Sequence, residues 1–232
     1  MTRFVLVHGA WHGSWCWARL RRLLAAQGHE VFTPTLTGLG ERSHLLSRDI
    51  GLETHIADVT NLLAWEDLRD IVLVGHSYGG VVVRHAADRM ADRIRSLVYL
   101  DAFVPEDGKA LSDYLPDGGA ADREQAARDG DGWKVSPIPA SVFAVNAADA
   151  AWVDRQCTPQ PLATFTTPAR LTGACDGIAE IGYILATSFH GPFGQFAAVA
   201  ESRGWWRHDI ACGHDVMLDA PEELAAVLLQ RA

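Results

Sequence analysis

The stretch Ile71-Val-Leu-Val-Gly-His-Ser77-Tyr-Gly-Gly-Val-Val-Val83 decides the fold. It joins an apolar, β-branched run, which predicts a buried strand, to the start of an amphipathic helix. The five residues from Gly75 to Gly79 match the pattern Gly-x-Ser-x-Gly, which is typical of a sharp strand-to-helix turn. Small residues around the serine tolerate the strained backbone and close packing of such a turn. The pattern therefore favours Ser77 as a nucleophile, held above a sheet beside a helix N-terminus, over a glycine-rich turn that only packs.

Short apolar runs alternate with amphipathic stretches on both sides of this turn. We expect strands at residues 4–7, 30–32, 70–75, 94–100, 169–172 and 206–211, and helices at residues 15–27, 52–65, 81–90, 178–187 and 221–230. Such alternation predicts an α/β fold of about six mostly parallel strands, with right-handed crossovers and helices on both faces.

The alternation loosens between Pro105 and Pro168, where the chain is rich in Ala, Asp, Gly and Pro. This region is too long for an ordinary loop. We expect residues 106–166 to form an inserted cap over the carboxyl ends of the strands, where sheets of this kind bind ligands. Residues 1–105 and 167–232 would then form the core domain.

The composition excludes several classes of protein. The 232 residues are 48% hydrophobic and 21% charged, which argues against disorder and fits a single-core domain. The net charge of −9 disfavours a nucleic-acid partner and an anionic membrane surface, both of which select clustered Lys and Arg. No apolar run approaches the roughly 20 residues of a membrane helix, and the start does not resemble a secretory signal. We expect a cytoplasmic protein whose four cysteines, which lack C-x-x-C spacing, are free thiols.

A serine hydroxyl needs a general base at neutral pH. His214 lies between the last predicted strand and the closing helix, which is where this architecture places the base. His8 and His12 follow the first strand instead, and His76 is adjacent to Ser77. We therefore expect His214 to take the proton of Ser77.

The base needs an acid that fixes its tautomer and stabilises its cation. Asp176 follows a late predicted strand, and the order Ser77, Asp176, His214 is typical of such enzymes. Asp101, directly after the strand that ends at Leu100, is the alternative acid. Asp215, next to the base, is expected to act as a local cap.

An oxyanion hole needs two backbone N–H groups directed at the developing negative charge. The residue after the nucleophile, Tyr78, supplies one of them, and Ala10 in the loop after the first strand supplies the other. Trp11, His12 and Trp133 are candidates for the substrate pocket.

Other chemistries find no support in the sequence motifs. The chain has neither H-E-x-x-H nor H-x-H-x-D, so metal-dependent hydrolysis is not expected. It also has neither G-x-G-x-x-G nor G-x-x-x-x-G-K-[ST], so no nucleotide cofactor is expected. We predict that the protein works without a metal or a cofactor.

Several segments resemble one branch of the α/β-hydrolase superfamily. That branch includes plant salicylic-acid-binding methylesterases and hydroxynitrile lyases, and the likeness is greater still to bacterial carboxylesterases of the pyrethroid-hydrolase type. The matching segments are residues 5–17, 35–42, 75–80, 100–105 and 212–221, which span nearly the whole chain except the expected cap.

The resemblance implies a triad of Ser77, His214 and Asp176. It also implies oxyanion donors at Ala10 and Tyr78, and a ligand wall that includes Phe103. Lyases of this branch carry a Lys immediately after the catalytic His, whereas this chain has Asp215, which disfavours cyanohydrin cleavage.

These observations predict a cofactor-independent serine hydrolase. Its expected substrates are small to medium carboxylic esters with an apolar or aromatic portion, cleaved through an acyl-enzyme on Ser77. A ligand receptor that does not hydrolyse, and a lyase or cyclase on the same scaffold, are the alternatives. A small-molecule ester is the expected partner, and a homodimer is possible for such a domain.

Overall fold

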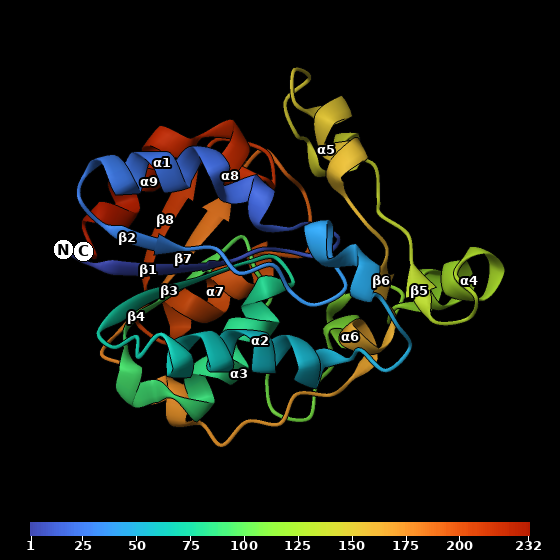
Figure 1. Ribbon diagram of the computed structural model, residues 1–232, viewed down its shortest axis with the longest axis horizontal. Helices are drawn as coiled ribbons and strands as arrows, with labels where there is room; N and C mark the ends of the chain where they lie inside the picture. Colours follow the sequence, from blue (N-terminus) through green and yellow to red (C-terminus); the bar gives the residue numbers. More distant parts are fainter.

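The computed structural model describes residues 1–232, and its centre is a six-stranded parallel sheet (Figure 1). The strands are β1 (Arg3–Val7), β2 (Glu30–Phe32), β3 (Ile71–His76), β4 (Ile94–Leu100), β7 (Glu180–Ala186) and β8 (Trp206–Ile210). Their order across the sheet is β2-β1-β3-β4-β7-β8, and every neighbouring pair is parallel. The predicted α/β architecture with six parallel strands is confirmed.

Two expected elements are wrong. Residues 178–187, expected as a helix, contain strand β7. A short apolar run that is buried on both sides shows neither the helical nor the strand periodicity, so its sequence does not distinguish a helix from a strand. Residues 178–187 form such a run. Residues 169–172, expected as a strand, join no sheet. Their backbone N–H groups bond instead to the Lys109 carbonyl and to the carboxylates of Asp107 and Asp88.

Helices cover both faces of the sheet and enclose two apolar cores (Figure 1). One face carries α1 (Ala18–Ala26), α8 (Val216–Asp219) and α9 (Pro221–Leu229), and the other carries α2 (Leu52–Trp65), α3 (Gly79–Arg89) and α7 (Gly194–Ser202). Side chains alternate between the cores along each strand. In β1, Phe4 and Leu6 enter the core under α1, α8 and α9, whereas Val5 and Val7 enter the core under α2, α3 and α7.

The segment 106–166 lies beyond the ends of the strands, on the right in Figure 1. It contains α4 (Ala120–Asp129), β5 (Lys134–Val135), α5 (Ala150–Gln156), β6 (Gln160–Pro161) and α6 (Ala163–Thr166). Strands β5 and β6 form a small antiparallel pair outside the main sheet. We refer to residues 106–166 as the cap segment; its status as a separate domain stays a prediction.

Short 3₁₀ turns connect many of these elements. They are η1 (Ser14–Trp17), η2 (Gly40–Leu45), η3 (Ala91–Arg93), η4 (Leu111–Tyr114), η5 (Ala140–Phe143) and η6 (Ala174–Gly177). None of the helices is both long enough and apolar enough to cross a membrane. The four cysteines form no disulfide bonds.

Candidate active site

The turn from β3 into α3 holds Ser77 in a strained conformation. Its φ of 53° lies in the left-handed region, which costs energy for a residue with a side chain. The Ser77 N–H donates to the Leu100 carbonyl at 3.2 Å, and the Ser77 carbonyl accepts from Phe103 N–H at 3.1 Å. A Cβ added at Gly79 would lie 2.6 Å from the carbonyl oxygens of Val7 and His8, so only glycine fits there. Backbone from two neighbouring strands thus fixes the position of the serine.

Asp101 holds the ring of His214. The His214 Nδ1–H donates to Asp101 Oδ2 at 2.6 Å, and both side chains are buried. The other carboxylate oxygen accepts from the Ala186 N–H at 3.2 Å. Burial raises the pKa of Asp101, and the hydrogen bond from His214 opposes that rise. Because the proton of the neutral ring sits on Nδ1, Nε2 is left as the acceptor that a general base needs.

Asp176, the acid preferred from sequence, is not near His214, and this preference is wrong. Its carboxylate lies half-exposed between Arg84 at 3.1 Å and Arg203 at 3.0 Å. The reason is that the strands on either side of Asp176 were predicted wrongly. Asp176 precedes β7, so it lies at the amino edge of the sheet, opposite the edge that carries Ser77. Asp101 directly follows β4 and lies at the carboxyl edge, so the structure supports the alternative acid.

Ser77 and His214 line one cavity of about 240 Å³. Its walls are mainly apolar and come from the core and the cap segment; they include Phe103, Leu111, Phe143, Phe165, Phe189 and Phe193. The rings of Phe143, Phe189 and Phe193 lie within 5.3 Å of the His214 ring, centroid to centroid. No hydrogen bond joins the Ser77 hydroxyl to the His214 ring; in free enzymes such contacts are often long and tighten when substrate binds.

Ala10 and Tyr78 border the same cavity beside Ser77. Neither residue's N–H donates to a backbone carbonyl, so both donors are available to a ligand. Their role as an oxyanion hole stays a prediction, and their placement is consistent with it.

The four residues expected to bind substrate fall into two groups. Trp11 and Phe103 line the cavity. His12 is 3% exposed and borders a small neighbouring hollow but not the cavity itself. Trp133 does not border the cavity either. The Trp133 ring lies instead beside the cations of Arg48 and Lys134, at 6.0 and 5.6 Å from its centroid. Cation–π contacts at the surface therefore account for Trp133, and the expectation for it is corrected.

A buried ion pair beside the site was not anticipated. Asp215 Oδ2 lies 3.1 Å from His12 Nε2, and His12 Nδ1 lies 2.7 Å from the Ala10 carbonyl oxygen. Burial alone would lower the pKa of His12, but the charge of Asp215 raises it well above its ordinary value. Burial opposes the ionisation of Asp215 as well, yet His12 holds its pKa far below the usual range. His12 is therefore a cation that donates from both ring nitrogens.

This pairing replaces the expected capping role of Asp215. The residue occupies the position before α8, but its side chain makes no capping hydrogen bond. The two partners are 203 residues apart, so no local spacing could have revealed the pair. The only local signal was that each partner lies close to a predicted site residue in the sequence: His12 is two residues from Ala10, and Asp215 is next to His214.

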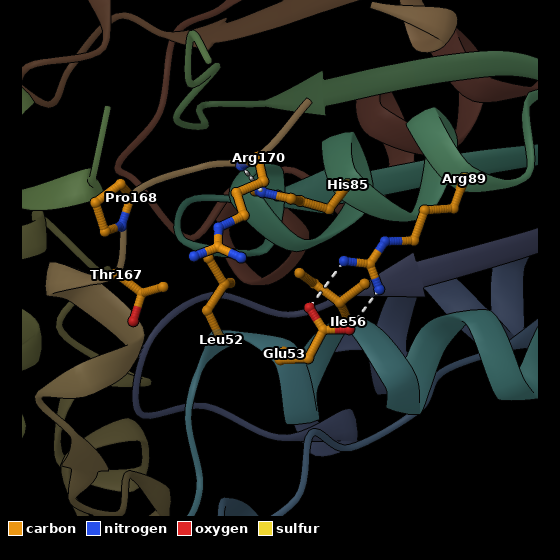
Figure 2. A pocket seen from close by; sticks show the side chains of 8 residues that line it. All are labelled: Leu52, Glu53, Ile56, His85, Arg89, Thr167, Pro168 and Arg170. Carbon is orange, nitrogen blue, oxygen red and sulfur yellow. Dashed lines mark hydrogen bonds and ion pairs between the residues drawn. The ribbon is translucent and has the colours of Figure 1, made fainter. Parts of the chain in front are cut away.

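A second hollow lies between α2 and α3 (Figure 2). It measures about 380 Å³ and is larger than the cavity at Ser77, but the two share no lining residue. Glu53 and Arg89 form a bidentate ion pair across it, at 2.5 and 2.8 Å. Because it contains no nucleophile beside a base, we do not assign the chemistry to it.

The chain contains no cluster of three or more His, Cys, Asp or Glu side chains arranged to hold a metal ion.

Comparisons with known proteins identify the family of the chain. A model of the alpha/beta hydrolase family matches residues 4–227. A carbendazim hydrolyzing esterase of Nocardioides sp. (strain SG-4G) is 46% identical over 241 aligned positions, which cover 98% of each chain. Methylesterase 2 of Arabidopsis thaliana is 38% identical over 105 residues, 44% of this chain and 40% of the plant protein.

Solved structures share the fold. An extracellular alpha/beta-hydrolase from a Paenibacillus species superposes with a TM-score of 0.86 at 24% identity, covering 99% of this chain and 98% of the other. A pyrethroid hydrolase from Sphingobium faniae JZ-2 gives a TM-score of 0.76 at 22% identity, covering 99% and 96%. At these identities the likeness concerns the arrangement of the backbone.

Proposed function

This chain belongs to the alpha/beta hydrolase family and is a hydrolase of the carboxylesterase type, and from that premise we propose that it cleaves small to medium apolar or aromatic esters through an acyl-enzyme on Ser77. The observation that carries the proposal is the buried 2.6 Å hydrogen bond from His214 to Asp101, beside Ser77 in one cavity. A strained serine next to a histidine of fixed tautomer is the arrangement that acyl transfer requires.

The reaction proceeds in two halves. His214 Nε2 accepts the proton of the Ser77 hydroxyl as its oxygen attacks the ester carbonyl, and the same proton passes to the departing alcohol. His214 then takes a proton from water as the water oxygen attacks the carbonyl of the acyl-enzyme. When the tetrahedral intermediate collapses, His214 returns this proton to the oxygen of Ser77, and the acid is released. Asp101 stabilises the imidazolium in both halves, because its carboxylate accepts from Nδ1.

The negative charge that develops on the carbonyl oxygen is met by the N–H groups of Ala10 and Tyr78. Loss of one such donor typically costs about 10²–10³ in rate, so this contact is a large part of the catalysis. The residue after His214 is Asp215, whose carboxylate is buried against His12, so no ammonium group stands beside the base. A lyase that depends on a lysine at this position therefore gains no support.

The cavity limits the substrate. A cavity of about 240 Å³ with mainly apolar walls suits a small to medium apolar or aromatic group. One relative, 46% identical, is named for hydrolysing carbendazim, so carbendazim belongs among the first compounds to test.

The experiment is the release of p-nitrophenol from acetyl, butyryl, octanoyl and benzoyl esters by the wild type and by Ser77→Ala. We expect a burst in proportion to the enzyme, followed by slower turnover, for the wild type only, with the octanoyl ester disfavoured by the small cavity. Equal rates for the two proteins on every ester would contradict the proposal and direct attention to a ligand receptor or to another reaction type.

A further inference from the structure

The cavity at Ser77 contains a single carboxylate besides its catalytic groups. Of its 16 lining residues, 12 are hydrophobic, and Asp122 is the one acidic side chain among them. Asp122 lies in the first turn of α4, in the cap segment, whereas Ser77 and His214 belong to the core. Asp122 therefore borders the cavity from the cap segment.

Asp122 has no partner of opposite charge. No Lys, Arg or His nitrogen lies within 4.0 Å of its carboxylate, as the full set of ion pairs shows. The adjacent Arg123 donates instead to the Gly118 carbonyl at 2.9 Å. Burial raises the pKa of Asp122 and the charge of Asp117 adds to that rise, whereas the charge of Arg123 opposes it. A partly desolvated carboxylate without a partner is a cost to the free protein.

Helix capping does not explain Asp122. The start of α4 is already held by Asp117, whose carboxylate accepts from the N–H groups of Gly119 and Ala121 at 2.9 and 2.7 Å. Ligand cavities of this kind are typically apolar with a few polar groups that fix the orientation of the ligand. Asp122 has the position and the chemistry of such a group.

We propose that Asp122 recognises a hydrogen-bond donor, an ammonium or a hydroxyl group, on the part of the ester that lies away from the reacting carbonyl. This inference rests on the proposed function and narrows its substrate class. The preferred substrate has an ester carbonyl at Ser77, one apolar ring between the phenylalanine side chains, and a donor at the cap segment. A hydrogen bond to a charged acceptor, part-exposed as here, changes kcat/KM by about tenfold.

The test uses three methyl arylacetates of nearly equal shape that differ in one para substituent: ethyl, hydroxymethyl or aminomethyl. Rates are measured for the wild type, for Asp122→Asn and for Asp122→Leu. We expect the wild type to favour at least one donor substrate over the ethyl substrate by about tenfold in kcat/KM, and Asp122→Leu to abolish that preference. Preference for aminomethyl alone identifies a cationic donor, and preference for both donors identifies hydrogen bonding in general.

Glu124→Gln is the matched control, because Glu124 is an exposed carboxylate two residues further along the same helix. It removes the same charge from α4 and should keep the wild-type ratios. Equal ratios in the wild type and Asp122→Leu, or an equal loss in Glu124→Gln, would overturn the inference. Thermal unfolding of each variant verifies that the ratios come from folded protein.

Binding of the same three esters to the Ser77→Ala protein, measured by calorimetry with and without Asp122→Leu, separates two kinds of failure. Should no ester be hydrolysed, the proposed function fails, and the binding ratios still decide the role of Asp122. Should hydrolysis depend on Ser77 while neither rates nor binding respond to Asp122, only this inference fails.

Discussion

Asp101 lies buried against His214, whereas Asp176 lies half-exposed between two arginines. We predict that Asp101→Asn lowers kcat by about 10³–10⁴, because the ring loses the acceptor that fixes its tautomer. Asp176→Asn should stay within about twofold of the wild type, since Asp176 precedes β7 and lies at the edge of the sheet opposite Ser77. Steady-state hydrolysis of p-nitrophenyl butyrate measures both variants. A large loss for Asp176→Asn with a small one for Asp101→Asn would restore the acid that the sequence favoured.

The ion pair of His12 and Asp215 makes the stability of the protein depend on pH. The pKa of His12 is raised, so its contribution to stability is complete below its unfolded pKa of about 6.5 and is lost as the pH rises through the folded pKa. The pKa of Asp215 is lowered, so its contribution is complete above about pH 4 and is lost at more acidic pH. Both contributions are complete between about pH 4 and pH 6.5.

Asp215→Asn should therefore lower the free energy of unfolding by about 3–5 kcal/mol, because it leaves His12 buried without its counter-ion. The loss should be larger at about pH 5.5 than at about pH 8.5, following the sign derived above. Urea denaturation at the two pH values measures it, with the double variant His12→Gln/Asp215→Asn as the control, which should lose less than the sum of the single losses. A loss that does not depend on pH would show that the pair is not ionised.

Among the elements, the cap segment is joined to the loop after β1 by three hydrogen bonds of Trp11. Its N–H donates to Gln160 Oε1 at 2.9 Å, its carbonyl accepts from Thr158 N–H at 2.9 Å, and its indole N–H donates to the Val135 carbonyl at 3.2 Å. Trp11 also has a φ of 63°, in the left-handed region. These contacts hold the strained loop that presents the Ala10 N–H to the cavity.

Gln160→Met keeps the length of the side chain but removes the acceptor of the Trp11 N–H. We predict that kcat falls by about tenfold or more with a smaller change in KM, since a misplaced oxyanion donor acts mainly on the transition state. Gln125→Met is the control, because the Gln125 side chain accepts only from Ser136, inside the cap segment. If both variants lower kcat equally, general disturbance of the cap segment is the cause, and the specific role of Gln160 is wrong.

Over the whole molecule, three strands bring the reacting groups together at one edge of the sheet. Ser77 follows β3, Asp101 follows β4 and His214 follows β8. No cluster of metal-ligating side chains exists anywhere in the chain. We predict that dialysis against EDTA leaves kcat and KM for p-nitrophenyl butyrate unchanged. Activity that is lost on dialysis and restored by a divalent cation would contradict the proton-transfer mechanism.

The features that depend on a few consecutive residues could be predicted from the sequence. The Gly-x-Ser-x-Gly turn, the strands before it and the position of His214 each show in a few consecutive residues. The choice of acid was not local, because it depended on which segments of the late chain are strands. Residues 169–172 were expected as a strand and β7 as a helix, so Asp176 was expected to follow a strand, whereas it precedes one. The His12–Asp215 pair depends on the tertiary fold alone.

Trapping the covalent intermediate shows which side chain is the nucleophile. The wild type and Ser77→Ala are mixed with p-nitrophenyl benzoate and quenched in acid within the burst, and the intact mass and a peptide map are recorded. We predict that the mass of the wild type increases by one benzoyl group, located on Ser77, and that the mass of Ser77→Ala does not change. Turnover without any covalent species, or a benzoyl group on a cysteine or on His214 in its place, would contradict it.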